Sequence, residues 1–246
     1  MLRRFRADLH VHTCLSPCGD LLMSPGNIAA EAQKKKLSLV AICDHNSAEN
    51  AAAVSKVAES RGVVILPGLE ICTSEEIHFL AIFENMEAAA QMQMLVFAHL
   101  SGVNTPEVFG LQVVANECDE VERFQEKLLI GATDLDLNEA VSYAHKLGGL
   151  AVASHIDKES NSVFSQLGFI PRGIGFDALE LTKYCGSSEA RARFSLPEDV
   201  PIVRNSDAHM LADVGMNTCE YVLEQPSFSE LRLALRHEDG RTIECA

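Results

Sequence analysis

The chain alternates short apolar runs, rich in β-branched residues, with longer segments in which apolar positions recur every three or four residues. The short runs are typical of buried strands, and the longer pattern is typical of helices that bury one face. We predict strands over residues 6–12, 39–43, 63–71, 77–83, 150–154, 178–181, 202–204 and 219–222. We predict helices over residues 25–36, 47–60, 138–147, 187–194 and 227–236, several of which begin with Ser, Asn or Pro.

This alternation predicts a mostly parallel sheet with helices outside, either open or closed into a barrel. Polar residues favour the barrel, because they fall where apolar strands end, and a barrel gathers its strand ends around one mouth. An open sheet would spread them along an edge. The residues in these positions are His10, His12, His45, Glu70, His155, Asp207 and His209.

The segment 87–136 departs from this pattern, because its periodicity is weak and its histidine, His99, lacks a motif context. We interpret it as an insertion that carries helices and packs beside the barrel mouth. The rest of the chain shows no repeat, low-complexity tract or linker. Since single α/β barrels often reach 246 residues, we predict one domain over residues 1–246.

The composition, 47% hydrophobic and 22% charged, is that of a globular protein with enough apolar material for a core. No apolar stretch approaches the roughly 18 residues of a membrane span, so we expect no membrane partner. The early arginines lead into a strand pattern, which argues against a secretory signal. The eight cysteines form no Cys-x-x-Cys pair, and we expect free thiols in a reducing cytoplasm.

The formal net charge of −15 opposes binding to a long polyanion, because such binding depends on many lysines and arginines at the phosphates. We therefore expect no long nucleic acid as a partner. A small anion held at a locally positive site remains compatible with this charge.

Two distant segments carry paired metal-binding side chains. His10 and His12 are one residue apart on a predicted strand, so both imidazoles point to the same side. Asp207 and His209 repeat this spacing near the other end of the chain and add a carboxylate. Metal-dependent chemistry is therefore the leading interpretation.

Five segments, taken in order, resemble the motifs of the PHP (polymerase and histidinol phosphatase) superfamily of metal-dependent phosphoesterases. They are DLHVHTCLSPCGD, AICDHNS, LPGLEICTSEEIHFL, GGLAVASHID and VRNSDAHM, which together span residues 7–210. The resemblance implies a distorted seven-stranded (β/α) barrel with up to three metal ions in its mouth. It also implies that the metals activate a water for attack on phosphorus, with no catalytic group outside the metal ligands.

The resemblance further implies which residues bind the metals. One ion would be bound by His10, His12, Glu70 and Asp207. Glu70 would bridge to a second ion at His78 and His155, and Asp20, His45 and His209 would bind a third. This nitrogen-rich set suits two or three Zn²⁺, Mn²⁺ or Fe²⁺ ions better than Ca²⁺ or Mg²⁺.

The first motif departs from the family pattern, because SPCGD replaces the more usual Ser-Asp-Gly. The alternative role for Asp20 is that of a turn residue near the helix that begins at Pro25. Lys158, Lys183 and Arg204 follow or approach the same strand ends, and they are the candidates for binding substrate phosphate.

We predict a metal-dependent hydrolase that cleaves a phosphoester of a small phosphorylated metabolite or short nucleotide. Two alternatives remain open: a nuclease acting on polynucleotide, and a metal-binding regulatory module without turnover. The substrate, the physiological metal and the oligomeric state are not determined by the sequence.

Overall fold

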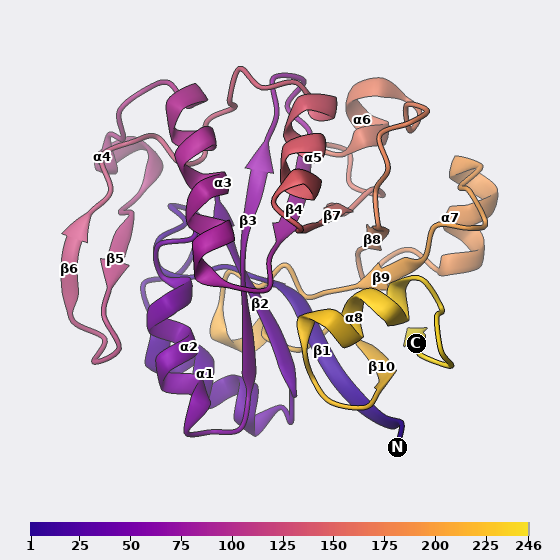
Figure 1. Cartoon of the computed structure of the whole chain (residues 1–246). Coiled ribbons are helices and arrows are strands. Elements are labelled where there is room, and N and C mark those ends of the chain that lie inside the picture. The colour runs from indigo at the N-terminus through magenta and orange to yellow at the C-terminus, as the bar shows by residue number, and fades with distance from the viewer. Residues whose placement is uncertain (246) are drawn as a thin grey trace.

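The computed structural model describes residues 1–245; residue 246, the last of the predicted domain, lies outside the described part. One nine-stranded sheet forms its centre, in the order β11-β10-β1-β2-β3-β4-β7-β8-β9 (Figure 1). The strands are β1 (Arg3–Val11), β2 (Leu39–His45), β3 (Val64–Cys72), β4 (His78–Ile82), β7 (Leu150–Ala153), β8 (Ala178–Leu181), β9 (Ile202–Arg204), β10 (Cys219–Leu223) and β11 (Thr242–Cys245). The helices are α1 (Pro25–Lys34), α2 (Ala51–Glu59), α3 (Met86–His99), α4 (Pro106–Phe109), α5 (Leu137–Lys146), α6 (Val163–Leu167), α7 (Ser187–Phe194) and α8 (Phe228–Leu235), with one 3₁₀ turn, η1 (Leu211–Asp213).

The sheet is strongly curved and nearly closed. Its two edge strands approach each other, since Cys245 Sγ on β11 lies 3.5 Å from the Ile202 carbonyl oxygen on β9. A parallel bridge between Val11 and Ala208 joins the end of β1 to the segment after β9. The α/β barrel-like architecture agrees with the prediction, but the strand count of seven does not.

β10 and β11 account for the two additional strands, because they form an antiparallel pair beside β1. The direction of the strands differs too, since β4 runs antiparallel to both β3 and β7. The sheet is therefore mixed rather than mostly parallel. β11 is short, and it lacks the apolar run by which the other strands were predicted.

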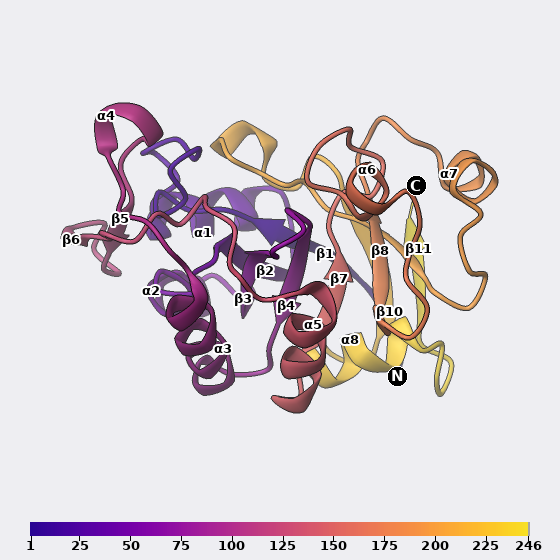
Figure 2. The same cartoon turned by 90° about the horizontal axis from the view of Figure 1, so that it is seen from above.

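Helices cover the outer face of the sheet. Figures 1 and 2 show α3 and α5 side by side along β3, β4 and β7. Phe79 and Ile71 on the strands belong to one buried apolar cluster with Met92 on α3 and Val141 on α5. The alternate strand positions, including Leu66 and Leu80, pack in a second cluster on the opposite face. Glu70 on β3 and His78 on β4 have the same parity as Leu66 and Leu80, so they point to this inner face near the strand ends.

The segment 87–136 contains most of α3, then α4 and a small hairpin of β5 (Val113–Ala115) and β6 (Val121–Phe124). Both figures show the hairpin standing at one edge of the molecule. The side chain of Asn50 binds the backbone of the hairpin, because its Nδ2 donates a hydrogen bond to the Val113 carbonyl at 3.0 Å. Asn46, the residue after His45, donates to the Leu129 carbonyl at 2.8 Å. The segment thus packs directly on the loop that follows β2.

Six of the eight cysteines are free thiols: Cys14, Cys18, Cys43, Cys72, Cys118 and Cys185. Cys219 and Cys245 form a disulfide between β10 and β11, which the expectation of free thiols did not include. These two strands pair directly, so the two cysteines face each other in the register. Among the described residues, no helix has the length and apolar character needed to cross a membrane.

Candidate metal centre

A backbone irregularity in β1 aims two histidines at the barrel interior. The register between β1 and β2 shifts between Asp8 and Val11, because one extra residue is accommodated on β1. Such a bulge redirects the side chains that follow it. His10 and His12 are both fully buried, and their Nε2 atoms lie 3.0 Å apart. The expected convergence of this pair is therefore observed.

Glu70 lies at the centre of the cluster. It is near the end of β3, it is 1% exposed, and its two carboxylate oxygens face imidazoles from four strands or strand ends. The imidazole nitrogens nearest Oε1 belong to His10 at 3.4 Å, His78 at 3.2 Å and His155 at 3.2 Å. Those nearest Oε2 belong to His12 at 3.4 Å and His45 at 3.1 Å.

Asp207 and His209 complete the cluster from the loop after β9. Asp207 Oδ1 lies 3.3 Å from His12 Nε2, and the rings of His12 and His209 stack with centroids 4.0 Å apart. Asp207 has a φ of 50° and His155 a φ of 29°, in the left-handed region that non-glycine residues rarely adopt. Backbone strain at two residues facing one cluster is typical of functional sites.

The ligating atoms form three groups, in each of which all atoms lie within 4.8 Å of one another. The groups are His10 with His12, Glu70 and Asp207; His12 with His45 and His209; and His45 with Glu70 and His78. Asp207 Oδ1 is buried and accepts no hydrogen bond from the described residues. A buried carboxylate oxygen without a donor, surrounded by imidazoles, suits a cation, because an unpaired buried charge is otherwise costly. The donor set therefore fits divalent metal ions.

Asp20 lies outside these groups. Its side chain is exposed, and Oδ1 accepts a hydrogen bond from the Leu22 amide at 2.8 Å, as a turn aspartate does. Its own amide donates to the His209 carbonyl at 2.8 Å, so the residue is near the centre through its backbone. The structure thus brings eight of the nine predicted ligands together and leaves the carboxylate of Asp20 turned to the solvent.

Several buried residues that hold the ligands in place were not singled out in the sequence. Glu180 on β8 accepts from His10 Nδ1 at 3.0 Å, which fixes the ring and directs its Nε2 to the centre. Ser16 Oγ contacts His12 Nδ1 at 2.9 Å and donates to Asp44 at 2.7 Å. The available signal was an acidic residue inside an apolar strand, as in ALEL and LVAICDH.

Electrostatics in the cluster favour an ionised Glu70 and a protonated His78, and they favour neutral imidazoles at His45 and His209. Burial opposes protonation of His78, but the negative charge of Glu70 outweighs it and raises the pKa of His78 to about 10. Burial lowers the pKa of His45 to about 4 and that of His209 to about 3, with the nearby His12 acting in the same direction. Burial also opposes ionisation of Glu70, yet His78 and His10 hold its pKa well below the usual range. Bound cations would replace these protons.

Two adjoining depressions open onto the centre. The first, of about 150 Å³, is lined by His45, Glu70, His78, His155, Lys158, Ser160, Asn161, Asp207 and His209. The second, of about 190 Å³, shares Lys158 and Asp207 with the first and extends to Lys183, Tyr184 and Asn217. Lys158 Nζ lies 2.5 Å from Asp207 Oδ2, at the boundary between the two. The structure therefore places Lys158 and Lys183 at the predicted mouth.

Arg204 has a different position. It is 7% exposed, and its Nη1 and Nη2 donate to the carbonyls of Thr182 and Cys185 at 2.7 Å and 2.6 Å. These bonds occupy the two amino groups that would grip a phosphate. The geometry argues against a direct substrate contact and assigns the guanidinium to the support of the loop after β8.

Comparison with known proteins points to one family. A model of the PHP domain matches residues 8–158, which is more than half of the chain. The uncharacterized protein MJ1587 from Methanocaldococcus jannaschii is 37% identical over 78 residues, which cover 28% of this chain and 46% of that protein. The uncharacterized protein YqxK from Bacillus subtilis is 31% identical over 116 residues, covering 45% of this chain and 29% of that protein. The chain thus spans less than half of either relative.

Solved structures share the fold at low sequence identity. The lesion-specific endonuclease PfuEndoQ from Pyrococcus furiosus superposes with a TM-score of 0.72 and 20% identity, over 98% of this chain and 58% of that chain. A candidate metal-dependent phosphoesterase from Bifidobacterium adolescentis gives a TM-score of 0.56 and 18% identity, over 82% of this chain and 87% of that chain. The residues 8–158 that match the family model contain six of the eight clustered side chains. Because this match covers more than half of the sequence, the chain belongs to the PHP domain family.

Proposed function

We propose that the chain is a metal-dependent hydrolase that cleaves a phosphoester of a small phosphorylated metabolite or short nucleotide. The observation that carries this proposal is the convergence of six imidazoles on Glu70 and Asp207 beside Lys158. Imidazole and carboxylate ligands at several adjoining positions are the donor set of multinuclear hydrolytic centres.

The division of the ligands in this proposal is the one that the family resemblance implies. His10, His12, Glu70 and Asp207 would hold one ion, and His78 and His155 would hold a second through the shared oxygen of Glu70. His45 and His209 would hold a third ion, and His12 belongs to the same group of ligating atoms. Asp20 is the further ligand of this ion that the resemblance implies. Bound Zn²⁺, Mn²⁺ or Fe²⁺ would supply Lewis acidity and lower the pKa of a water.

The residues of the chain would provide binding and orientation. Glu180 and Ser16 fix the rings of His10 and His12, so that the same nitrogen of each faces the centre. The Lys158 ammonium, which pairs with Asp207, would bind a phosphate oxygen in the first depression. Lys183 would face the remainder of the substrate across the second depression.

The size of the two depressions supports a small substrate. An enclosed cavity of about 150 Å³ holds one benzene-sized ring. The two depressions, of about 150 Å³ and about 190 Å³, are open and polar, and each has room for a group such as a phosphate, a single sugar or a base. We also propose that residues 1–246 form one domain and that segment 87–136 is an insertion that shapes specificity at the rim.

Metal analysis combined with a substrate panel tests this function. Protein purified without chelator is expected to contain two or three transition-metal ions per chain and, with Mn²⁺, Zn²⁺ or Fe²⁺ added, to hydrolyse some phosphorylated sugars or nucleotides. Absence of metal even after reconstitution would remove the basis of the proposal. Full metal loading without hydrolysis of any phosphoester would favour the regulatory module instead.

A second candidate is a nuclease, because the chain shares the fold of PfuEndoQ over 98% of its length. A related structure holds endonuclease Q with a 27-mer duplex that has an abasic lesion at the active site. The net charge of −15 weighs against this candidate. Cleavage of an abasic duplex more efficiently than of any mononucleotide would establish it.

A further inference from the structure

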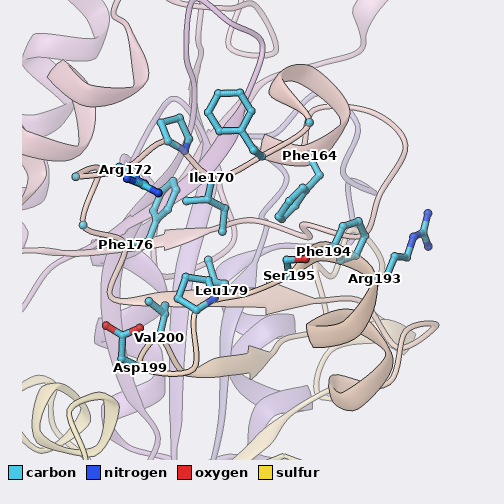
Figure 3. A pocket seen from close by; sticks show the side chains of 16 residues that line it. Phe164, Ile170, Arg172, Phe176, Leu179, Arg193, Phe194, Ser195, Asp199 and Val200 are labelled. Carbon is cyan, nitrogen blue, oxygen red and sulfur yellow. The ribbon is translucent and has the colours of Figure 1, made fainter.

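A second cavity lies on the opposite face of β8 from the metal centre. It has a volume of about 620 Å³ and is bounded by α6, α7 and the loop 168–176 (Figure 3). Leu179 on β8 lines this cavity, whereas the next residue, Glu180, binds His10 on the inner side. Because successive side chains of a strand point to opposite faces, the cavity and the metal centre lie on the two sides of β8 and are not connected through it.

The walls of this cavity are mainly aromatic and aliphatic. The rings of Phe164 and Phe194 pack with centroids 4.5 Å apart, and Phe176 and Leu179 are buried beneath the cavity. Figure 3 shows Ile170 between Phe176 and Phe164, with Leu179 below them in this view. A concave site with mostly apolar walls and a volume between about 300 and 1,000 Å³ is typical of small-molecule binding.

The polar groups at its ends are predominantly cationic. Figure 3 shows Arg172 and Arg193 at opposite ends of the apolar surface. Both are exposed, and neither makes an ion pair or side-chain hydrogen bond with the residues that the structure describes. Asp199 is the one carboxylate among the lining residues. The Arg193 guanidinium lies over the Phe194 ring, 4.9 Å from its centroid, and points outward in Figure 3. In a chain with a net charge of −15, two guanidinium groups that lack a carboxylate partner among the described residues favour an anion beside this cavity.

We propose that this cavity, bounded by α6, α7 and β8, is a binding site for a small anion with an aromatic or alicyclic body. The ring system would pack on Phe164, Phe176 and Phe194, and the anionic group would pair with Arg172 or Arg193. An arginine on an aromatic wall suits such a ligand, because its planar group both stacks and forms charge-assisted hydrogen bonds. This site is independent of the phosphoesterase proposal, since it shares no lining residue with the two depressions at the metal centre.

Two fluorescent dyes with the same rings test the site. Anilinonaphthalene sulfonate carries a negative charge, and phenylnaphthylamine does not. The native protein is expected to bind the sulfonate dye saturably, with one dye per chain. The double variant R172Q/R193Q is expected to bind it about tenfold more weakly and to retain the affinity for the neutral dye, because only the charge-assisted bonds are lost.

Matched variants locate the dye. Phe169 lines the cavity and is 60% exposed, so Phe169→Asp should weaken both dyes without unfolding the protein. Phe124→Asp, at a 54% exposed position on β6, and Arg236→Gln, at an exposed position after α8, serve as controls. Absence of saturable sulfonate binding, or equal weakening in the control variants, would overturn the proposal.

Discussion

Glu70 is the residue on which the candidate metal centre depends most. Five imidazole nitrogens lie within 3.4 Å of its two oxygens, while the residue itself is almost completely buried. Its negative charge is what allows so many ligands, and the cations they would bind, to stay close together. A neutral side chain of the same shape would preserve the packing and remove that charge.

We therefore expect Glu70→Gln to lower phosphoesterase kcat/KM by more than about a hundredfold and to reduce the bound metal, with the fold retained. Steady-state kinetics, metal analysis and circular dichroism provide the measurements. Glu76→Gln is the matched control, because Glu76 is an exposed residue two positions before His78. A Glu70→Gln protein with near-native turnover and full metal content would show that this carboxylate does not bridge.

His78 gives the metal-free protein a defined pH dependence. Its pKa is raised to about 10, against about 6.5 in an unfolded chain, so its proton stabilises the metal-free fold at neutral pH. This contribution is complete below pH 6.5 and is lost as the pH rises toward 10. Metal binding must release the proton, and the affinity for metal should increase over the same interval.

Two measurements check this behaviour. Calorimetry in buffers of different ionisation enthalpy should show fewer protons released by metal at pH 7.5 in His78→Asn than in the native protein. The Tm of the chelated native protein should fall from pH 7 to pH 10, and that of the variant should fall less. Equal proton release in the two proteins would contradict the assignment.

At the scale of elements, five helices and eight strands follow from periodicity, whereas α3, α4 and α6 were not predicted as individual helices. The predicted helix 138–147 and the observed α5 differ by one residue at each end. A capping box of Asp136 and Glu139 sets the start of α5 at Leu137. β5 and β6 are three and four residues long, too short to carry a periodic signal.

The candidate site shows the same division. His10 and His12 were predictable, because a spacing of two along a strand places both side chains on one face. Asp207 and His209 have the same spacing, but they lie in the loop after β9, where the φ of 50° at Asp207 replaces the extended backbone of a strand. The role of Glu180 was not, since its contact with His10 joins strands separated by 170 positions in the sequence. The burial of Arg204 likewise depends on two carbonyls that only the folded loop after β8 presents.

The capping box of α5 allows a test at this scale. Asp136 accepts from the Glu139 amide at 2.8 Å, and removal of such a cap costs about 1 kcal/mol of unfolding free energy. Asp136→Ala should therefore lower Tm by roughly 2–4 °C in a chain of this length. Glu59→Ala, at the exposed end of α2, should leave Tm unchanged. A stable Asp136→Ala protein would mean that packing alone holds the start of this helix.

At the scale of the whole molecule, the net charge of −15 should govern how phosphorylated substrates approach. Two lysines, Lys158 and Lys183, line the second depression at the mouth. A mononucleotide presents few charges to this surface, whereas a long single strand presents many that the protein would repel.

We expect kcat/KM for a mononucleotide to exceed that for a 20-mer single strand, and the value for the 20-mer to rise with added salt. Screening weakens the repulsion between like charges, while a protein with a basic track loses affinity for nucleic acid as salt increases. Rates measured at about 50 and 200 mM NaCl distinguish the two cases. A steep fall for the 20-mer would favour the nuclease.

The distribution of the clustered residues along the chain has a consequence for biosynthesis. The first, His10, and the last, His209, are separated by about 200 residues, which a ribosome adds in about 10–40 s. During that interval the early histidines exist without Asp207 and His209. The full cluster can therefore form only after Asp207 and His209 have been synthesised, when most of the strands of the sheet already exist.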